Sequence, residues 1–86
     1  MGLLDKFFAK YDDAKLVRQV ELALIEDPRL KNVGDINVVS ENGVIQLTGH
    51  VPQEVAKDRA ETIAVQSVSA IGLKYDHVEN RLEVVK

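Results

Sequence analysis

His50 and His77 are the only histidines of the chain, and histidine is the side chain that most often moves protons or binds metals near neutral pH. A zinc site needs about three or four ligands, and the chain has no cysteine that could complete one. The sequence also shows no Ser-His-Asp order, no nucleophile elbow and no glycine-rich phosphate loop. We therefore expect two surface histidines, no metal, no cofactor and no catalytic residues.

Carboxylates and polar residues offer two places where a ligand could bind instead. Glu26, Asp27 and Asp35 flank one loop, where their oxygens could gather around a cation, although loose acidic loops are usually unoccupied. A second candidate is the polar face of the expected sheet, which either recognises a partner or is simply hydrated. Its residues are Gln46, Thr48, Glu79, Arg81 and Glu83.

Charge and hydropathy limit the class of partner. The formal net charge of −3 gives no reason to bind nucleic acid and argues weakly against a general attraction to anionic membranes. No run approaches the ~20 apolar residues that span a bilayer. The first residues do not form a secretory signal, because Asp5, Lys6 and Lys10 interrupt their apolar side chains. Lys6 also occupies the position at which a myristoylation site carries Ser or Thr. We expect a cytoplasmic protein.

The clearest structural signal is Asn42-Gly43, which separates two apolar-alternating runs over residues 36–48. A type I′ turn needs positive φ at both central residues, and Asn and Gly tolerate this best. With these residues as the loop, Val38 faces Leu47 and one face of the hairpin becomes apolar. That face holds Ile36, Val38, Ile45 and Leu47. We expect the second strand to end at Gly49, where another backbone passes closely.

Two helices are expected to cover the apolar face of this hairpin. The first runs over residues 14–26, where Asp12 and Asp13 can cap its beginning. It stops before Pro28, because proline disfavours helical geometry in the residue before it. The second runs over residues 52–69 and begins with a proline, which fits the first turn of a helix.

A third strand is expected over residues 78–85, where apolar and charged residues alternate. Gly72 ends the helix before it. Asn80 is the polar exception on the inner face, and we expect its side chain to bond backbone at a sheet end or bulge. The apolar members of that face are Val78, Leu82 and Val84.

An amphipathic segment precedes the first helix, and we assign residues 1–12 to it and residues 13–86 to the domain. A helix this short is unstable in water, so its apolar stripe needs a cover. That cover is the domain itself, a second copy of the chain or a membrane surface, and the shortness and two lysines of the segment favour the first two. The stripe consists of Leu3, Leu4, Phe7, Phe8 and Tyr11.

These elements predict an α+β fold with the order α-β-β-α-β, preceded by the short N-terminal helix. The expected architecture is a two-layer sandwich, in which two helices lie on one face of a three-stranded mixed sheet. If the second and third strands are parallel, their crossover should be right-handed. The order of the strands in the sheet stays open.

The pattern from Leu16 to Val84 resembles the BON domain family, named for bacterial osmotically induced and nodulation proteins. The hairpin block is the most specific part, and Lys74-Tyr75 depart from the Gly-Val that the family usually carries before its last strand. The matching motifs are Glu26-Asp27-Pro28, Ile36-x-Val38, Asn42-Gly43-Val44-Ile45-Gln46-Leu47-Thr48-Gly49-x-Val51, Ala60, Ile63, Ala64 and Val78-x-Asn80-x-Leu82-x-Val84.

The resemblance implies a non-catalytic bacterial binding module that associates with phospholipid or with envelope or protein partners. It assigns structural roles to Pro28, Asn42, Gly43, Gly49 and Asn80, and it leaves the N-terminal stripe as the candidate contact. The start MGLLDKFF is also similar to that of members that join one BON domain to a LysM domain and bind potassium. This similarity implies cation sensing or a stress-related cytoplasmic role as an alternative, and self-association through Phe7 and Phe8 is a third.

Overall fold

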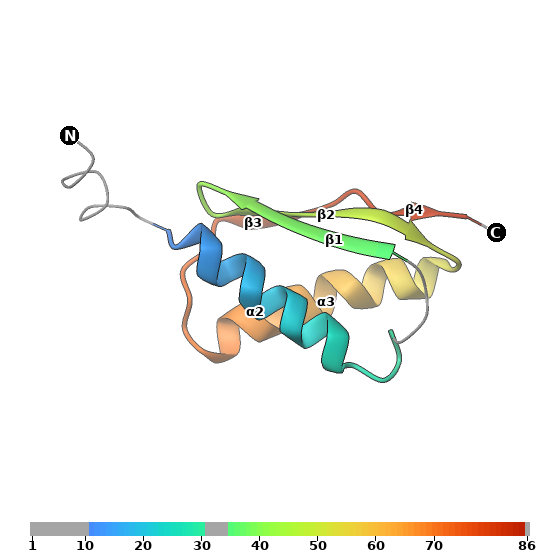
Figure 1. The fold of residues 1–86 in the computed structure, drawn as a ribbon, viewed down its shortest axis with the longest axis horizontal. Helices are drawn as coiled ribbons and strands as arrows, with labels where there is room; N and C mark the ends of the chain where they lie inside the picture. The colour runs from blue at the N-terminus through green and yellow to red at the C-terminus, as the bar shows by residue number, and fades with distance from the viewer. Residues whose placement is uncertain (1–10, 31–34, 86) are drawn as a thin grey trace.

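The chain forms two layers, a mixed sheet with two helices on one face, in a computed structural model that describes residues 11–30 and 35–85 (Figure 1). The expected α+β class and the order α-β-β-α-β are confirmed. The helix expected before them lies outside the described residues, except for Tyr11, which is not helical. The elements are α2 (Asp13–Glu26), β1 (Asp35–Glu41), β2 (Val44–Val51), α3 (Glu54–Ala70), β3 (His77–Asn80) and β4 (Glu83–Val84).

β2 is the central strand of the sheet. It pairs with β1 in antiparallel fashion and with β3 and β4 in parallel fashion, which settles the strand order that the sequence left open. The hairpin register is the expected one, with Val38 opposite Leu47 and Glu41 opposite Val44. Asn42 and Gly43 have φ values of 51° and 82°, as a type I′ turn requires.

The core lies between the sheet and the two helices. Ile45 and Leu47 of β2 have no exposed surface, and Ala60 and Ala64 are equally buried on α3. The two alanines have short side chains, so α3 can lie close to the sheet. Burying a Leu or Ile side chain contributes about 1.5–3 kcal/mol, so the inner face of β2 is a main source of stability. The buried set is Leu16, Val20, Leu24, Leu30, Val38, Ile45, Leu47, Val51, Ala56, Ala60, Ala64, Val68 and Leu82.

The expected end of the second strand at Gly49 is wrong, because β2 continues to Val51. Gly49 has a φ of 122°, a conformation that side-chain-bearing residues rarely adopt. A Cβ at Gly49 would lie against the backbone of Asp35, so the expected close approach of another backbone is confirmed. Past Gly49, His50 and Val51 still pair with β4. The glycine therefore marks a close backbone contact here and not the end of the strand.

The expectation of one strand over residues 78–85 is also wrong in part, because that stretch is divided into β3 and β4. Asn80 lies at the division. Its Oδ1 accepts a 3.2 Å hydrogen bond from the backbone N–H of Leu82, and its Nδ2 donates a 2.8 Å bond to the carbonyl of Lys57 in α3. The side chain of Asn80 therefore bonds backbone, and it ties the gap between the two strands to the helix layer.

The helix ends differ slightly from expectation. α2 begins at Asp13, because Asp12 is the N-cap and its Oδ1 accepts a 3.1 Å bond from the N–H of Lys15. α3 begins at Glu54, so Pro52 precedes the helix and does not lie in its first turn. Gly72 follows α3 and donates its N–H to the carbonyl of Ser69 at 3.1 Å.

Candidate functional site

The helix-free face of the sheet brings together the polar residues that the sequence placed there. The strand registers put Gln46 beside Glu79 and His50 beside Glu83, all on the side away from the helices. Alternation along each strand then assigns the remaining outward strand positions. They are Asp35, Asn37, Val39, Glu41, Val44, Thr48 and His77. Arg81, just after β3, joins them through its bond to Glu79.

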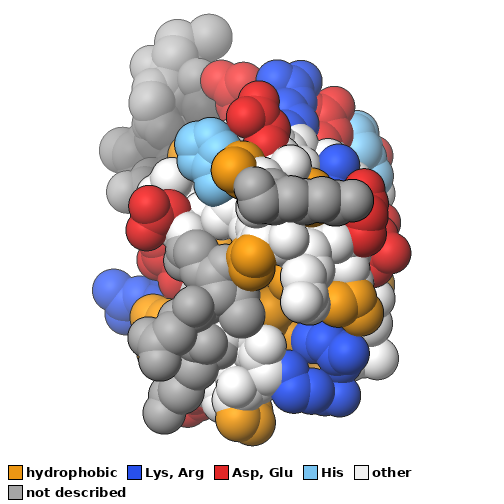
Figure 2. Space-filling model, turned by 90° about the vertical axis from the view of Figure 1, so that its right-hand side faces the viewer, with side chains coloured by type: hydrophobic (Ala, Val, Ile, Leu, Met, Phe, Trp, Pro, Cys, Tyr) orange, Lys and Arg blue, Asp and Glu red, His pale blue; other side chains and the backbone are white. Residues whose placement is uncertain are grey.

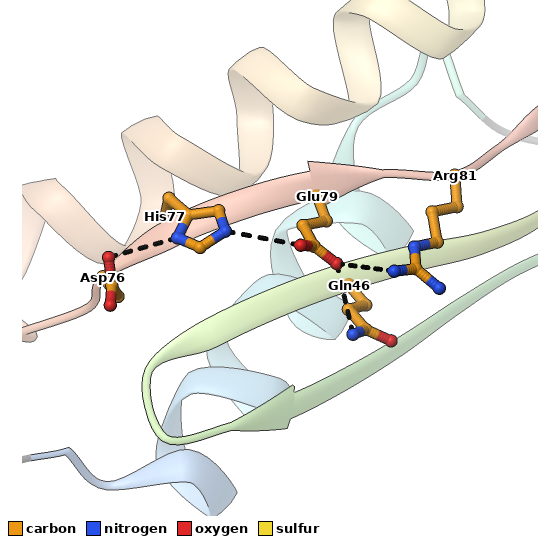
Figure 3. A network of polar contacts seen from close by, with 5 residues as sticks. All are labelled: Gln46, Asp76, His77, Glu79 and Arg81. Atoms are coloured by element: carbon orange, nitrogen blue, oxygen red, sulfur yellow. Dashed lines mark hydrogen bonds and ion pairs between the residues drawn. The ribbon is translucent and has the colours of Figure 1, made fainter.

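Glu79 is the centre of a polar network on this face (Figure 3). Its Oε1 accepts hydrogen bonds from Arg81 at 3.0 Å and from the side-chain amide of Gln46 at 3.3 Å. Its Oε2 lies 3.5 Å from Nε2 of His77, and the other ring nitrogen of His77 lies 3.1 Å from Asp76 Oδ1. Each charged group of the network thus has a partner of opposite sign within the network itself.

The two carboxylates beside His77 change its protonation. The hydrogen bond to Asp76 and then that to Glu79 raise the pKa of His77 above its ordinary value. The imidazole is half exposed and is held between two carboxylates, so the arrangement favours the charged ring. The sequence identified His77 as a surface histidine, but it did not identify Asp76 as its partner, because that contact depends on how the chain enters β3.

We expect Asp76→Asn to lower the pKa of His77, and Glu79→Gln to lower it by less, because each substitution removes a negative charge that favours the protonated ring. The pKa is higher in the folded state. Protonated His77 therefore stabilises the folded state below the ordinary pKa of His77, and this stabilisation is lost as the pH rises through the folded-state pKa. An NMR titration of the His77 ring would measure both shifts. Glu83→Gln is the control that should leave the titration of His77 unchanged, and an unmoved midpoint in Asp76→Asn would contradict the expectation.

Of the three carboxylates considered as a cation site, Asp27 is engaged with Arg29. Asp27 Oδ1 accepts bonds from the backbone N–H of Arg29 at 2.8 Å and from its Nε at 3.4 Å. The hydrogen bond from the Arg29 backbone is the main cause that lowers the pKa of Asp27. Pro28 lies exposed in the turn between them. Within residues 11–30 and 35–85, no group of three or more His, Asp or Glu side chains is placed to hold a metal ion.

Asp13 joins the start of α2 to the tip of the hairpin, which the sequence did not predict. Its carboxylate accepts bonds from the hydroxyl of Ser40 at 2.7 Å and from the N–H groups of Asn42 and Gly43 at 2.9 Å each. The sequence alone indicates Asp13 as a second cap of the helix. Only one residue can be the N-cap of a helix. The presence of two adjacent aspartates before this helix was therefore the sequence signal that one of them has another role.

Tyr11 covers the same turn. A Cβ placed on Gly43 would come within 2.5–2.7 Å of the Tyr11 ring, so the ring lies directly against this glycine. Tyr11 is half-buried and packs against the core. Of the apolar stripe, it is the member that the structure describes, whereas Leu3, Leu4, Phe7 and Phe8 lie outside the described residues.

Replacing Asp13 by alanine is expected to lower the free energy of unfolding by about 1–3 kcal/mol, because three hydrogen-bond donors at the turn lose their acceptor. Partial burial raises the pKa of Asp13, but the bonds from Gly43, Ser40 and Asn42 outweigh it and hold the pKa below its ordinary value. The stabilisation is therefore present above the ordinary carboxylate pKa and is lost as the pH falls through the folded-state value.

Urea unfolding of Asp13→Ala at neutral and acidic pH would measure both effects, and the loss should shrink at acidic pH. Asp12→Ala is the matched control, since it removes the helix cap and leaves the turn bonds intact. NMR of the Gly43 amide gives a second readout, because this N–H bonds to Asp13. Equal shifts of the Gly43 amide resonance in the two variants would contradict this hydrogen bond.

Exposed apolar side chains are distributed over several elements in the described part of the chain. Figure 2 shows the end of the molecule at which β4 lies, with acidic, basic and His side chains along its upper part, and apolar side chains scattered among the others. None of the helices that the structure describes is long and apolar enough to cross a membrane. The most exposed large apolar residues are Leu22, Ile25, Val39, Val55, Ile71 and Val85.

Comparison with known proteins identifies a family and a relative to which the chain is similar. The BON domain family matches residues 12–86. The outer membrane lipoprotein DolP of Haemophilus influenzae is 42% identical to the chain over 53 residues. That match covers 62% of the chain and 28% of the lipoprotein, so it compares one part of a longer protein with the fold described above.

Proposed function

Because this chain belongs to the BON domain family, we propose that it is a non-catalytic binding module that associates with phospholipid membranes. The family match over residues 12–86 is the observation that carries the proposal. The similar lipoprotein is named for the outer membrane, which supports the choice of a lipid surface over other partners. The cytoplasmic location expected from the sequence stays a prediction.

The polar face supports a binding role and not a catalytic one. His77 and Arg81 both contact Glu79, and His50 lies 3.4 Å from Glu83 on the same face. Both histidines are therefore engaged with carboxylates on an open surface. General acid–base catalysis needs such groups within reach of a held substrate, and a surface that leaves them exposed to water does not supply this.

The N-terminal stripe is the proposed lipid contact, in place of the docking on the domain or a second copy that its shortness and two lysines favoured, because the family match and the similar outer membrane lipoprotein support a lipid surface. Leu3, Leu4, Phe7 and Phe8 are large apolar residues close together in the sequence, and apolar burial rather than charge would drive binding in a chain of net charge −3. Tyr11, which ends the stripe, packs on the hairpin turn at Gly43. The segment therefore joins the domain at the hairpin end of the sheet.

Vesicle co-sedimentation tests this proposal. Vesicles of phosphatidylcholine, with and without phosphatidylglycerol, are mixed with the full chain and with a variant that carries Ser at positions 3, 4, 7 and 8. Tyr11 is kept, so its packing on the domain is not altered. We expect the full chain to bind both kinds of vesicle. The affinity of the variant should be lower by about tenfold or more, because most of the apolar area of the stripe is removed.

Val55→Ser is the matched control, because Val55 is an apolar side chain that is 53% exposed elsewhere on the surface. It should bind vesicles like the unchanged chain. Failure of the full chain to sediment with either kind of vesicle would overturn the proposal. Equal binding by the full chain and the four-serine variant would overturn the assignment of the contact.

A further inference from the structure

One edge of the sheet is a continuous strand whose outward backbone groups pair with no other strand among residues 11–30 and 35–85. β1 is the outermost strand on its side, and no strand among the described residues pairs with its outer edge (Figure 1). The two-residue turn is closed by Glu41 and Val44, so the backbone groups of Glu41, Val39 and Asn37 pair with β2. Because the pattern alternates, the backbone groups of the residues between them point outward, away from β2. These residues are Ile36, Val38 and Ser40.

The opposite edge of the sheet is not a continuous strand with which another strand could pair. It is divided into β3, of four residues, and β4, of two. Between them, the side chain of Asn80 already accepts the N–H of Leu82, at 3.2 Å. Short, interrupted edges of this kind resist pairing with another strand. The seven residues of β1 therefore form the edge that a further strand can extend.

The charges along β1 select among possible strands. Asp35 and Glu41 stand at its two ends and are exposed on the helix-free face, where Val39 between them is 50% exposed. A second copy of β1, paired over its full length in antiparallel fashion, would place Asp35 of one chain opposite Glu41 of the other at both ends. Like charges directly opposite each other destabilise a strand pair. A strand with basic ends would instead place a positive charge opposite each carboxylate.

We propose that the outer edge of β1 binds an extended peptide segment of a protein partner, in which a short β-forming run is flanked by two basic residues. The segment runs antiparallel to β1, and its backbone pairs with that of Ile36, Val38 and Ser40. Its basic side chains lie opposite Asp35 and Glu41 on the helix-free face. This inference does not rest on the proposed membrane contact, which uses a different part of the chain.

The test uses a synthetic peptide with the length of β1, Lys-Thr-Val-Val-Thr-Val-Lys, blocked at both ends. In the proposed register its first and last residues face Glu41 and Asp35, and its fourth residue faces Val38. A peptide N-methylated at the fourth residue loses a donor toward β1. A peptide N-methylated at the third residue loses one that points away, so it is the matched control. Binding is followed by NMR on the full chain.

We expect the peptide to shift the amide resonances of β1 and to slow hydrogen exchange at Ile36 and Val38. N-methylation at the fourth residue should weaken binding about tenfold, and N-methylation at the third should not. A variant with Asp35→Lys and Glu41→Lys should prefer the same peptide with glutamate at both ends. Both charged residues are exposed, so this double variant should fold.

Several outcomes would overturn the inference. One is the absence of any β1 shift at millimolar peptide, and another is equal weakening by the two N-methylated peptides. An unchanged preference in the charge-swapped variant would exclude the role of Asp35 and Glu41. A dimer of the unchanged chain whose exchange protection lies on β1 would show that the edge is occupied by a second copy instead.

Discussion

Replacing Gly49 by alanine is expected to lower the free energy of unfolding by about 3 kcal/mol or more, for two reasons that add. The φ of 122° is strained for any residue with a Cβ. A Cβ at this position would also lie 2.9 Å from the carbonyl carbon of Asp35 and closer still to its oxygen. The obstacle is backbone of the neighbouring strand, so relief requires β1 and β2 to move apart. Urea unfolding followed by circular dichroism would measure the loss.

Gly72→Ala separates the two causes. Gly72 also has a positive φ, 71°, but no atom lies within 4 Å of the place that a Cβ would take. Gly72→Ala should lower the free energy of unfolding by about 1 kcal/mol, which is the conformational cost alone. If the two variants are destabilised equally, the contact of the new Cβ with Asp35 adds nothing to the cost of Gly49→Ala. The strands would then not lie as close together at Gly49 as the structure has them.

Leu47→Ala should cost about 2–5 kcal/mol, because it leaves a cavity beneath the central strand. Leu47 has no exposed surface, faces Val38 across the hairpin and lies beside Asn80 of β3. In a domain of this size that loss is a large part of the total stability, so part of the population should be unfolded at 37 °C or at modest urea. Thermal and urea unfolding would both report it.

Val39→Ala is the matched control for Leu47→Ala. Val39 lies on the adjacent strand, but on the opposite face, and it is 50% exposed. Its truncation should change the unfolding free energy by less than about 1 kcal/mol. Similar losses in the two variants would mean that the apolar face of the hairpin has been assigned to the wrong side of the sheet.

The hairpin was the most predictable part of the fold, because its determinants are local. Asn42 and Gly43 specify the turn, and alternation then decides which side of each strand is buried. The register of Val38 with Leu47 followed from these two facts. The helices were predictable in the same way, since their apolar spacing and the proline after α2 are signals within a few residues.

The ends of the strands were less predictable, because distant contacts decide them. The division after Asn80 depends on a bond to the carbonyl of Lys57, 23 residues earlier in the chain. The continuation of β2 past Gly49 depends on pairing with β4. Propensities within a short window carry no information on either contact, so they predicted one long strand and an early end.

The polar face was predicted as a set of residues but not as a network. Alternation placed Gln46 and Glu79 on one side, and the parallel register then brought them to 3.3 Å. The role of Asp13 at the turn escaped prediction, because a local helix-capping role already explained that residue. A side chain with two plausible partners is where sequence reasoning most needs the tertiary structure.

The turn held by Asp13 and the short strand β4 mark opposite ends of β2, an eight-residue strand about 25 Å long. Tyr11 enters the fold beside that turn, and Val85 leaves it beyond β4. Any domain fused before residue 11 would thus be separated from one fused after residue 85 by the whole length of the sandwich. In such an assembly this fold would hold the two points of attachment, residues 11 and 85, apart as a spacer.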